Sequence, residues 1–425
     1  MKKILIAHIP NTLNYGSAMM AINLISGLRE GAVEEIEIYC DSDEYHLARL
    51  REATGDEKLM GYLSPREKLP TNFLKKVGNY LLGHDTGIKS IVEKFDMMIV
   101  VGGDDLSETY MKSAIIKGLM YRKINENCMV ILAGQSFGPF TGFYKLTAKW
   151  IYRKLTIITR EDNSHEFIKY SLGLKNTLKS RDLAIKCLPE QQKWKESARK
   201  FYIKNDYIAI VPSGLFRKYI EDKEIYISTW ICIIKKILHR DEKNHILLIA
   251  HVLKPDHASD ATVINEIIKR IDPEYKGRIS SLTQPMQPAE ARAILGGAKY
   301  VITGRMHAAV SSFFEGKPAL SLAYSEKFFG VIGRGFGLPQ LIIDCRSRKF
   351  CLNSTILDEI EKGVNYIESE YSELIVKIEA NVQICKAMVD NQIEFLSSLV
   401  SGQQANVALN KLKEGSSGLN SIAGK

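Results

Sequence analysis

The chain has 425 residues, which is long for one domain, and its hydrophobic content of 45% and charged content of 25% are typical of globular proteins. No apolar run approaches the roughly 18 residues of a membrane-spanning helix, and the apolar run near the first residue is too short for a secretory signal. The formal net charge of +9 suits anionic partners, but no RNP motif, zinc finger or dense basic arm supports nucleic acid as one of them.

Short β-branched runs alternate with helical patterns through the first 186 residues. Strands are expected at residues 3–9, 36–40, 96–101, 129–133, 156–159 and 177–180. Helices are expected at residues 17–28, 110–124 and 142–155. This alternation predicts a mostly parallel sheet with helices on both faces, so we expect an N-terminal Rossmann-like α/β domain over residues 1–186.

A second α/β series follows a polar, lysine-rich stretch at 187–206 that reads as a linker. Strands are expected at 207–211, 245–250, 278–282, 300–304, 319–323 and 341–344, with helices at 228–240, 260–271, 287–298 and 308–316. These elements predict a C-terminal Rossmann-like domain over 207–350. A helical segment over 351–412 and a flexible tail over 413–425 complete the expected organisation.

Two doubly wound domains with terminal helices resemble the GT-B architecture, in which the domains face a central cleft. Ligands of open parallel sheets bind outside the carboxyl ends of the strands, so these ends are the places to search. The seven cysteines lack zinc-ligand spacing and are expected to be reduced thiols in a cytoplasmic protein.

The expected strand ends of the first domain carry glycines and small polar residues. These candidate cleft residues are Asn14, Tyr15, Gly16, Ser17, Gly102, Gly103, Asp104, Gly134, Gln135 and Ser136. Glycine allows a ligand to approach the backbone closely, and a helix that begins there offers free amides. The alternative is that they form helix caps and glycine turns. Arg160 follows another strand, and it suits either a bidentate anion contact or an ion pair with Glu161 or Asp162.

The expected strand at 300–304 ends in Gly304, and Arg305 and His307 follow at the start of a helix. Residues two apart in extended chain point to the same side, so this pair suits an anionic substrate that needs a proton. The alternative for His307 is a histidine with a purely structural role. Ser325 and Lys327 follow the next strand and are expected near the same place. Two histidines and an aspartate at 251, 257 and 260 fit no common metal motif, so we predict no metal site.

Taken in order, six segments resemble the polysaccharide pyruvyl transferase family. They are "NYGSAM", "VGGDDL", "GQSFGPF", "TREDNS", "RDLAI" and "GRMHAAVSSFFEGKPALSLAYSEKFFG". The chain departs from the family pattern at Ser17, where an aspartate is usual, at Asp104, where a third glycine is usual, and at "DLAI", which replaces a DPAF-like segment. These departures concern the acceptor more than the fold.

The resemblance implies transfer of pyruvate from phosphoenolpyruvate to a sugar of a cell-surface or exopolysaccharide, or of its precursor, as a cyclic ketal. It implies His307 as general acid, with Arg305 contacting phosphoenolpyruvate. Arg160 and Lys327 would be further anion contacts, and Ser325 would line the same site. The resemblance needs no cofactor beyond this co-substrate, and it places the acceptor, a sugar or lipid-linked oligosaccharide, on the N-terminal domain.

Two other functions fit the same architecture. One is a glycosyltransferase that uses a nucleotide sugar, and the other is a non-catalytic glycan-binding protein. The basic surface and the helical tail suit either peripheral contact with the inner membrane surface or oligomerisation, and no oligomeric state is predicted.

Overall fold

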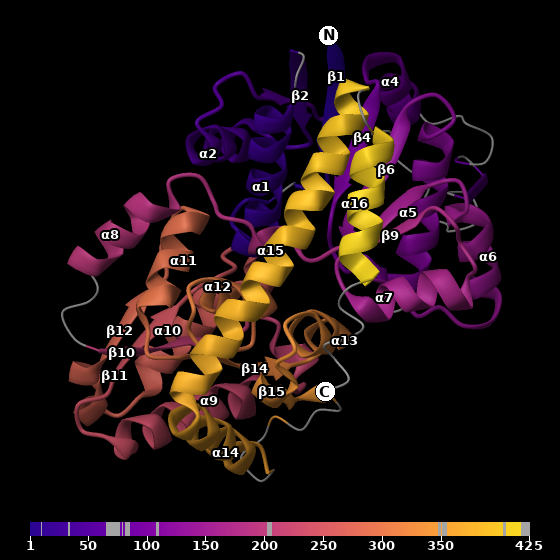
Figure 1. The fold of residues 1–425 in the computed structure, drawn as a ribbon. Coiled ribbons are helices and arrows are strands. Elements are labelled where there is room, and N and C mark those ends of the chain that lie inside the picture. The colour runs from indigo at the N-terminus through magenta and orange to yellow at the C-terminus, as the bar shows by residue number, and fades with distance from the viewer. Residues whose placement is uncertain are drawn as a thin grey trace. The chain divides into compact units, whose positions relative to one another are not determined.

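The computed structural model describes residues 1–9, 11–32, 35–64, 77–78, 80, 86–107, 110–201, 206–346, 350, 355–402 and 405–417 (Figure 1). The chain divides into two compact units. The N-terminal unit contains residues 1–12, 20–186 and 385–425, and the C-terminal unit contains residues 13–19 and 187–384.

The N-terminal unit is built on a seven-stranded sheet with the order β3-β2-β1-β4-β6-β8-β9. Its strands are β1 (Lys2–Ala7), β2 (Ile36–Cys40), β3 (Met60–Gly61), β4 (Met97–Val101), β6 (Met129–Gln135), β8 (Thr156–Thr159) and β9 (Thr177–Lys179). All neighbours are parallel. Every residue of β4 is buried, as expected for a strand covered on both faces. All six strands expected in this half are present, and β3 is an addition.

Helices cover this sheet. They are α1 (Tyr15–Gly31), α2 (Glu44–Thr54), α4 (Thr86–Lys94), α5 (Met111–Ile124), α6 (Gly142–Tyr152) and α7 (Asp162–Glu166). Figure 1 draws α5 and α6 as neighbours, and the Tyr152 hydroxyl on α6 donates to the Ala114 carbonyl of α5. The buried faces of α4, α5 and α6 form one apolar core with strands β1, β4 and β6.

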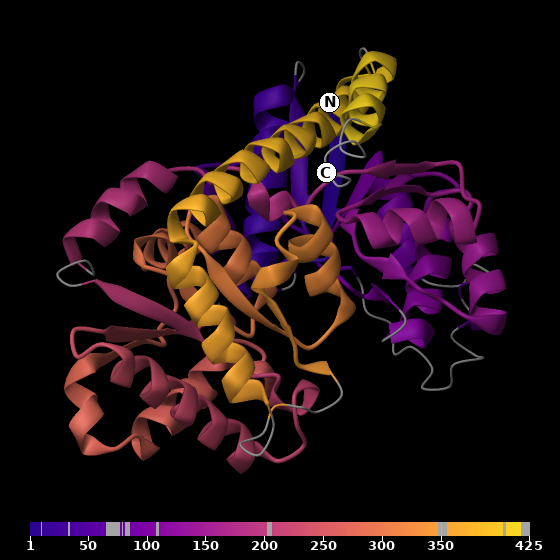
Figure 2. The same ribbon diagram turned by 60° about the horizontal axis from the view of Figure 1, so that its bottom comes forward.

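The C-terminal unit is built on a six-stranded sheet with the order β12-β11-β10-β13-β14-β15. Its strands are β10 (Tyr207–Val211), β11 (His245–Ile249), β12 (Ile279–Leu282), β13 (Val301–Thr303), β14 (Ala319–Ala323) and β15 (Ile342–Asp344), and all pairs are parallel. Helices α9 (Lys223–Arg240) and α10 (Asp260–Arg270) pack together, as do α11 (Pro288–Gly297) and α12 (Met306–Phe314). Figure 2 shows the strands of this unit with helices on both sides.

The structure departs from the expected linker and tail. Helix α8 (Gln191–Phe201) occupies the stretch that was expected to be a linker. It packs on α11, where the side-chain amide of Gln191 donates a hydrogen bond to the Ala289 carbonyl. The C-terminal helices α14 (Ile356–Ser369), α15 (Tyr371–Ser401) and α16 (Ala405–Ser417) are not a separate part, since α15 passes from the C-terminal to the N-terminal unit at residue 385. Helix α16 extends four residues beyond the expected start of the tail, and residues 418–425 lie outside the described residues.

Both sheets have the strand order of a Rossmann fold. Numbered within its own sheet, the C-terminal unit reads 3-2-1-4-5-6, and the N-terminal unit reads the same with a seventh strand added. The order reverses between β10 and β13 in one sheet and between β1 and β4 in the other. A Rossmann fold binds its ligand at this reversal, outside the carboxyl ends of the strands.

Candidate functional site

Arg305 lies at the strand-order reversal of the C-terminal sheet, directly after β13 and Gly304. Its side chain is 10% exposed and is held by Asp260, whose Oδ1 atom is 3.0 Å from Nε and 2.7 Å from Nη2. Nη2 also donates to the Ala258 carbonyl at 2.6 Å. Among the described residues Nη1 has no hydrogen-bond partner. The guanidinium is therefore fixed through Nε and Nη2, which leaves the Nη1 group for a ligand.

Asp260 orients Arg305 from a fully buried position at the start of α10. Its carboxylate also accepts hydrogen bonds from the backbone amides of Gly214 at 2.7 Å, His251 at 3.0 Å and Val252 at 2.8 Å. Burial lowers the pKa of Arg305, but the charge of Asp260 outweighs burial and raises it. Arg305 is thus a permanent cation, and Asp260 ties the ends of β10, β11 and β13 together around it.

His307 lies in the first turn of α12, for which Arg305 is the N-cap residue. Its imidazole packs against the backbone of Gly16, in the first turn of α1. A Cβ atom at position 16 would lie 2.2 Å from Nδ1 and 2.4 Å from Cγ of His307. Only glycine fits there, so Gly16 sets the position of the His307 ring.

His251, at the end of β11, is buried, with 1% of its surface exposed. Burial and the neighbouring charges of His307, Arg305 and Arg292 hold its pKa well below the ordinary value, so this ring is neutral. Its Nε2 atom has no hydrogen-bond partner among the described residues. The ring meets Tyr15 edge to face, with centroids 5.5 Å apart.

Ser325 and Lys327 follow β14, the strand beside β13. Ser325 is the N-cap of α13 (Glu326–Phe328), and its Oγ is buried without a partner in the described part of the chain. Lys327 places Nζ 5.1 Å from the ring centre of Tyr324. The Tyr219 hydroxyl lies 3.0 Å from the Gly304 carbonyl and 2.9 Å from that of Leu322, and so it fixes the two strand ends relative to each other.

The segment expected on the N-terminal domain, residues 14–17, belongs to the C-terminal unit. Asn14 pairs with Val252 in an isolated antiparallel bridge, and the Tyr15 amide donates to the His251 carbonyl at 3.2 Å. The Tyr15 ring is buried, and its hydroxyl accepts a hydrogen bond from the Met286 amide. Gly16 and the half-buried Ser17 therefore belong to the same unit as His307, whereas the other glycine loops belong to the N-terminal unit.

The glycine loops of the N-terminal unit are packed against each other. A Cβ at Gly102 would lie 2.0 Å from the carbonyl oxygen of Gly134, and one at Gly103 would lie 2.8 Å from Cε1 of His8. The amide of Gln135 donates to the carbonyls of Val100 and Val101, both at 3.2 Å. These contacts give Gly102, Gly134 and Gln135 a structural reason for their identity. Asp104 lies half-buried in the same loop.

Arg160 also belongs to the N-terminal unit, after β8. It is 2% exposed, its Nε donates to Ser136 Oγ at 2.9 Å, and its Nη1 pairs with Asp182 at 3.0 Å. The alternative of a surface pair with Glu161 or Asp162 is wrong, because the partner is Asp182 and both groups are buried. Two of the six sequence segments, "TREDNS" and "RDLAI", thus meet at this ion pair.

A cluster that sequence reasoning missed lies at the strand-order reversal of the N-terminal sheet. His8 follows β1 with a left-handed backbone (φ 75°), which is strained for a histidine. Asp41, after β2, accepts hydrogen bonds from the amides of His8 at 2.6 Å and Ile9 at 2.8 Å. The His8 Nε2 is 2.6 Å from Asp105, and the ammonium of Lys117 contacts the same carboxylate oxygen.

This geometry fixes the protonation of His8. Nδ1 faces the Val101 carbonyl at 3.1 Å, and Nε2 faces Asp105. Both groups only accept hydrogen bonds, so both nitrogens carry a proton. Burial lowers the pKa of His8, but Asp105 outweighs burial and raises it. Burial raises the pKa of Asp105, but His8 and Lys117 outweigh it and lower that pKa. His8 was missed because the expected strand at 3–9 included it, whereas β1 ends at Ala7.

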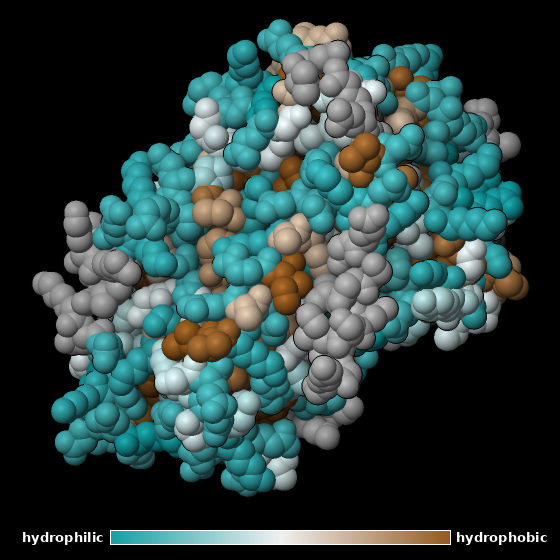
Figure 3. Space-filling view, viewed as in Figure 1, coloured by the Kyte–Doolittle hydropathy of each residue, from teal (hydrophilic) through white to brown (hydrophobic). Residues whose placement is uncertain are grey.

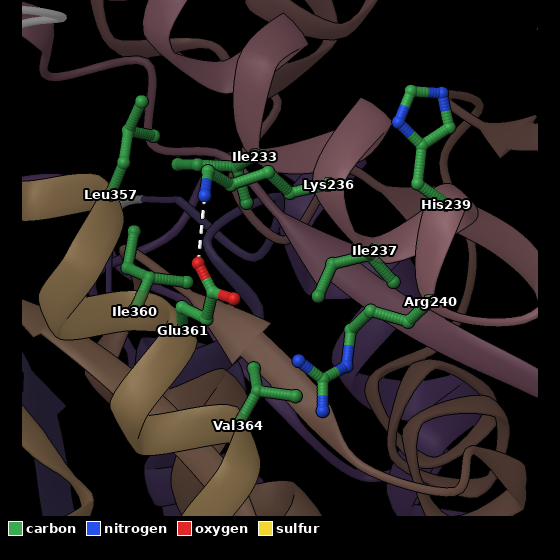
Figure 4. Close-up of a pocket in the computed structure, with 9 residues that line it drawn as sticks. All are labelled: Ile233, Lys236, Ile237, His239, Arg240, Leu357, Ile360, Glu361 and Val364. Atoms are coloured by element: carbon green, nitrogen blue, oxygen red, sulfur yellow. Dashed lines mark hydrogen bonds and ion pairs between the residues drawn. The ribbon is translucent and has the colours of Figure 1, made fainter.

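Three pockets lie away from these strand ends. One, of about 240 Å³, lies between α9 and α14, where Lys236 and Glu361 point toward each other and pair at 2.7 Å (Figure 4). A second, of about 690 Å³, includes Ile208 and Tyr300 at the amino ends of β10 and β13. The third, of about 640 Å³, lies beside α15 in the N-terminal unit. None contains a residue predicted from the sequence.

The part of the chain that the structure describes contains no group of three or more histidine, cysteine, aspartate or glutamate side chains placed to hold a metal ion. Asp260 is occupied by Arg305 and three amides.

In the same described part of the chain, no helix is long and apolar enough to cross a bilayer, and the six cysteines are free thiols. Cys351 lies outside it.

The family model described as polysaccharide pyruvyl transferase matches residues 14–326. None of the curated proteins compared with the chain matches it. Among solved structures, MnaA of S. aureus with UDP has a TM-score of 0.61 at 11% identity, covering 95% of this chain and 99% of that one. UDP-GlcNAc 2-epimerase of Neisseria meningitidis bound to UDP-GlcNAc has a TM-score of 0.58 at 11% identity, covering 94% and 99%.

A third neighbour is Anabaena Alr3699/HepE in complex with UDP and glucose. Its TM-score is 0.54 at 11% identity, covering 94% of this chain and 100% of that one. At these identities the likeness concerns the fold alone, and it identifies the two Rossmann-like units as GT-B-like.

Proposed function

The chain belongs to the polysaccharide pyruvyl transferase family, and from this premise we propose that it transfers pyruvate from phosphoenolpyruvate to a sugar as a cyclic ketal. The sugar belongs to a cell-surface polysaccharide, an exopolysaccharide or a lipid-linked precursor, and the reaction takes place in the cytoplasm. The observation that carries the proposal is the pair of Arg305, fixed by Asp260 with Nη1 left over, and His307, fixed against Gly16.

Phosphoenolpyruvate presents a carboxylate and a phosphate, which are the anions that a fixed guanidinium binds best. Arg305 holds one of them through Nη1. Lys327 supplies a second positive charge from the end of β14, and Ser325 Oγ, buried without a partner in the described residues, supplies a hydrogen bond. His251 is buried and neutral, so it adds no second positive charge beside His307. The Nε and Nη1 atoms of Arg160 already donate hydrogen bonds to Ser136 and Asp182. Its role toward the substrate is therefore less direct than the anion contact that the sequence suggested.

The reaction needs one positioned acid. A sugar hydroxyl oxygen bonds to C2 of phosphoenolpyruvate while protonated His307 gives its proton to the C3 methylene, which becomes a methyl group. A second hydroxyl of the same sugar then bonds to C2, and the bond between C2 and the phosphate oxygen breaks. The two hydroxyl protons leave, one to restore His307 and the other with the phosphate. Arg305 and Lys327 stabilise the negative charge on the departing phosphate.

We assign the acceptor hydroxyls to His8, Asp105 and Lys117 of the N-terminal unit. A carboxylate held ionised by two cations is a weak base but a strong hydrogen-bond acceptor, which suits the binding of sugar hydroxyls. The isosteric Asp105→Asn variant is therefore expected to bind phosphoenolpyruvate normally while the rate of phosphate release with a sugar acceptor falls.

The donor assignment is tested by the unfolding temperature of the whole protein with added phosphoenolpyruvate. A ligand that binds only the folded state at about 100 times its Kd adds about 2.7 kcal/mol of stability. We expect a clear rise, and Arg305→Lys, which keeps the charge but loses the two-pronged geometry, should reduce it. Inorganic phosphate at the same concentration controls for non-specific anion binding. A rise equal in the variant, or equal with phosphate alone, would refute the donor site.

The second candidate, a nucleotide-sugar transferase, is favoured by structural neighbours that are complexes with UDP and with UDP-GlcNAc. The same titration with UDP and UDP-GlcNAc separates the two functions. Stabilisation by these nucleotides without stabilisation by phosphoenolpyruvate would replace the proposal. A glycan-binding protein without catalysis would respond to neither small anion.

A further inference from the structure

Helix α6 presents apolar side chains on its solvent face. Phe143 is 77% exposed, Leu146 is 69% exposed and Trp150 is 40% exposed. Positions three and four apart lie on one face of a helix, so the three side chains form a stripe. The opposite face of the helix buries Ala148, Ile151 and Tyr152 in the core. The outward stripe therefore contributes nothing to the core that holds α6 in place.

Basic residues flank this stripe without acidic partners. Residues 141–155 contain Lys145, Lys149, Arg153 and Lys154 but no aspartate or glutamate. Lys149, Arg153 and Lys154 are exposed, and none of the four forms an ion pair with a described residue. The guanidinium of Arg122 lies over the Trp150 ring at 4.2 Å from its centre and adds a further cation.

The segment that follows α7 extends the same pattern. Tyr170, in the π-helical turn Phe167–Ser171, is 73% exposed, and Lys169 lies beside its ring with Nζ 5.4 Å from the centre. A Cβ at Gly173, two residues after this turn, would lie 3.7 Å from Nζ of Lys149, so the end of the segment adjoins α6. Figure 3 shows a mostly hydrophilic face with several groups of hydrophobic spheres, one of them at the edge on the side where Figure 1 draws α6.

An apolar stripe with an aromatic residue and flanking lysines is the pattern of a helix that lies in a membrane interface. The charge identifies the membrane, because anionic headgroups attract Lys and Arg while neutral ones do not. A second copy of the chain fits poorly, since pairing two such faces would bring eight unpaired basic residues together. Nucleic acid fits poorly because its polar backbone offers nothing to the central apolar stripe.

We propose that the α6 face, made of Phe143, Leu146 and Trp150 with Lys145, Lys149, Arg153 and Lys154, docks the protein on an anionic lipid surface. The apolar side chains enter the headgroup region, and the basic side chains contact lipid phosphates. This proposal is independent of the transferase reaction. Phosphoenolpyruvate binding is measured without lipid, so either proposal can fail alone.

The test is co-sedimentation of the full chain with phosphatidylcholine vesicles that contain phosphatidylglycerol, and with vesicles of phosphatidylcholine alone. We expect binding to the anionic vesicles only. Leu146→Glu should abolish it, and the pair Lys149→Gln with Arg153→Gln should weaken it by roughly fivefold per charge. All three positions are exposed, so the unfolding temperature should stay unchanged. The matched control is Val376→Glu on α15, which is 67% exposed and should bind like the parent.

Three results would overturn the proposal. The first is an unmodified chain that fails to sediment with anionic vesicles, and the second is a Leu146→Glu variant that sediments as well as its parent. The third is a dimer, seen by light scattering in the absence of lipid, that Leu146→Glu converts to a monomer. That third result would make the α6 face a contact between copies of the chain.

Discussion

Gly16 and His307 lie so close that a methyl group added at position 16 would displace the His307 ring. Gly16→Ala would place Cβ 2.2 Å from Nδ1 of His307, so the imidazole must move. We expect a loss of phosphate release of about 100-fold, the usual cost of a misplaced catalytic group, with a normal circular dichroism spectrum. Gly277→Ala is the control, because a Cβ there meets nothing within 4 Å. Full activity in Gly16→Ala would show that the ring position does not matter.

Glu161 makes the stability of the protein depend on pH. Burial raises its pKa to about 7 from an ordinary value of 4.5, although the amide of Ser164 favours the ionised form. The folded state therefore holds this proton more tightly than the unfolded chain does. The free energy of unfolding should fall as the pH rises from 4.5 to 7, by about 3 kcal/mol for this group.

The isosteric variant Glu161→Gln removes this titration. Its unfolding temperature, compared with that of the parent, should rise steadily between pH 5 and pH 8. A difference that stays constant over that range would mean that Glu161 is ionised throughout in both states.

At the scale of elements, the strand ends of the N-terminal sheet are locked by backbone contact. Gly102→Ala would force Cβ to within 2.0 Å of the Gly134 carbonyl oxygen, and a backbone atom cannot turn away as a side chain does. We expect a loss of stability of about 3 kcal/mol or more, measured by urea unfolding. Gly55→Ala, at a site with open space, tests only the backbone strain of a left-handed glycine.

Most strands were predictable from the sequence because they are short, largely apolar runs. The expected bounds of β2, β8, β10 and β14 agree with those of the structure. Helix α8 was missed because its residues are mostly polar, and it packs through a few contacts such as that of Gln191. Its polar composition resembles that of a linker.

Arg305 and His307 could be proposed from the sequence because the two lie within a few residues of each other after one expected strand. Asp260 was noticed as a metal ligand to dismiss, but its role depends on a partner 45 residues away. The His8–Asp105 pair spans 97 residues, and a single sequence gives no signal for such a pairing. The role of Gly16 depends on a contact with a residue on another helix, and it too appears only in the fold.

At the scale of the whole molecule, the C-terminal helix α15 completes the N-terminal unit. Val389, Leu396 and Val400 are buried there, Ser180 Oγ donates to the Met388 carbonyl, and a Cβ at Gly27 would lie 2.5 Å from Ile393. Burying a side chain of this kind contributes about 1.5–3 kcal/mol, so this half-helix matches a large part of a typical domain's stability of about 5–15 kcal/mol.

A chain that ends at residue 384 is therefore expected to lose the cooperative unfolding of its N-terminal unit, measured by calorimetry. A chain that ends at Ser417 should melt like the full protein. If both melt alike, the second half of α15 is dispensable.

Helix α1 begins in one unit and continues in the other, with the change between residues 19 and 20. Neither unit is therefore a contiguous stretch of the gene. One Rossmann-like half could be exchanged with that of a relative to combine the proposed donor specificity of one protein with the acceptor specificity of another. This exchange would need four junctions. Two of them interrupt helices, at residues 19/20 and 384/385, and a single crossover at 186/187 would leave each unit with a fragment of the wrong parent. Recombination between relatives should therefore exchange this protein only as a whole. Its substrate specificity should change instead through substitutions in loops.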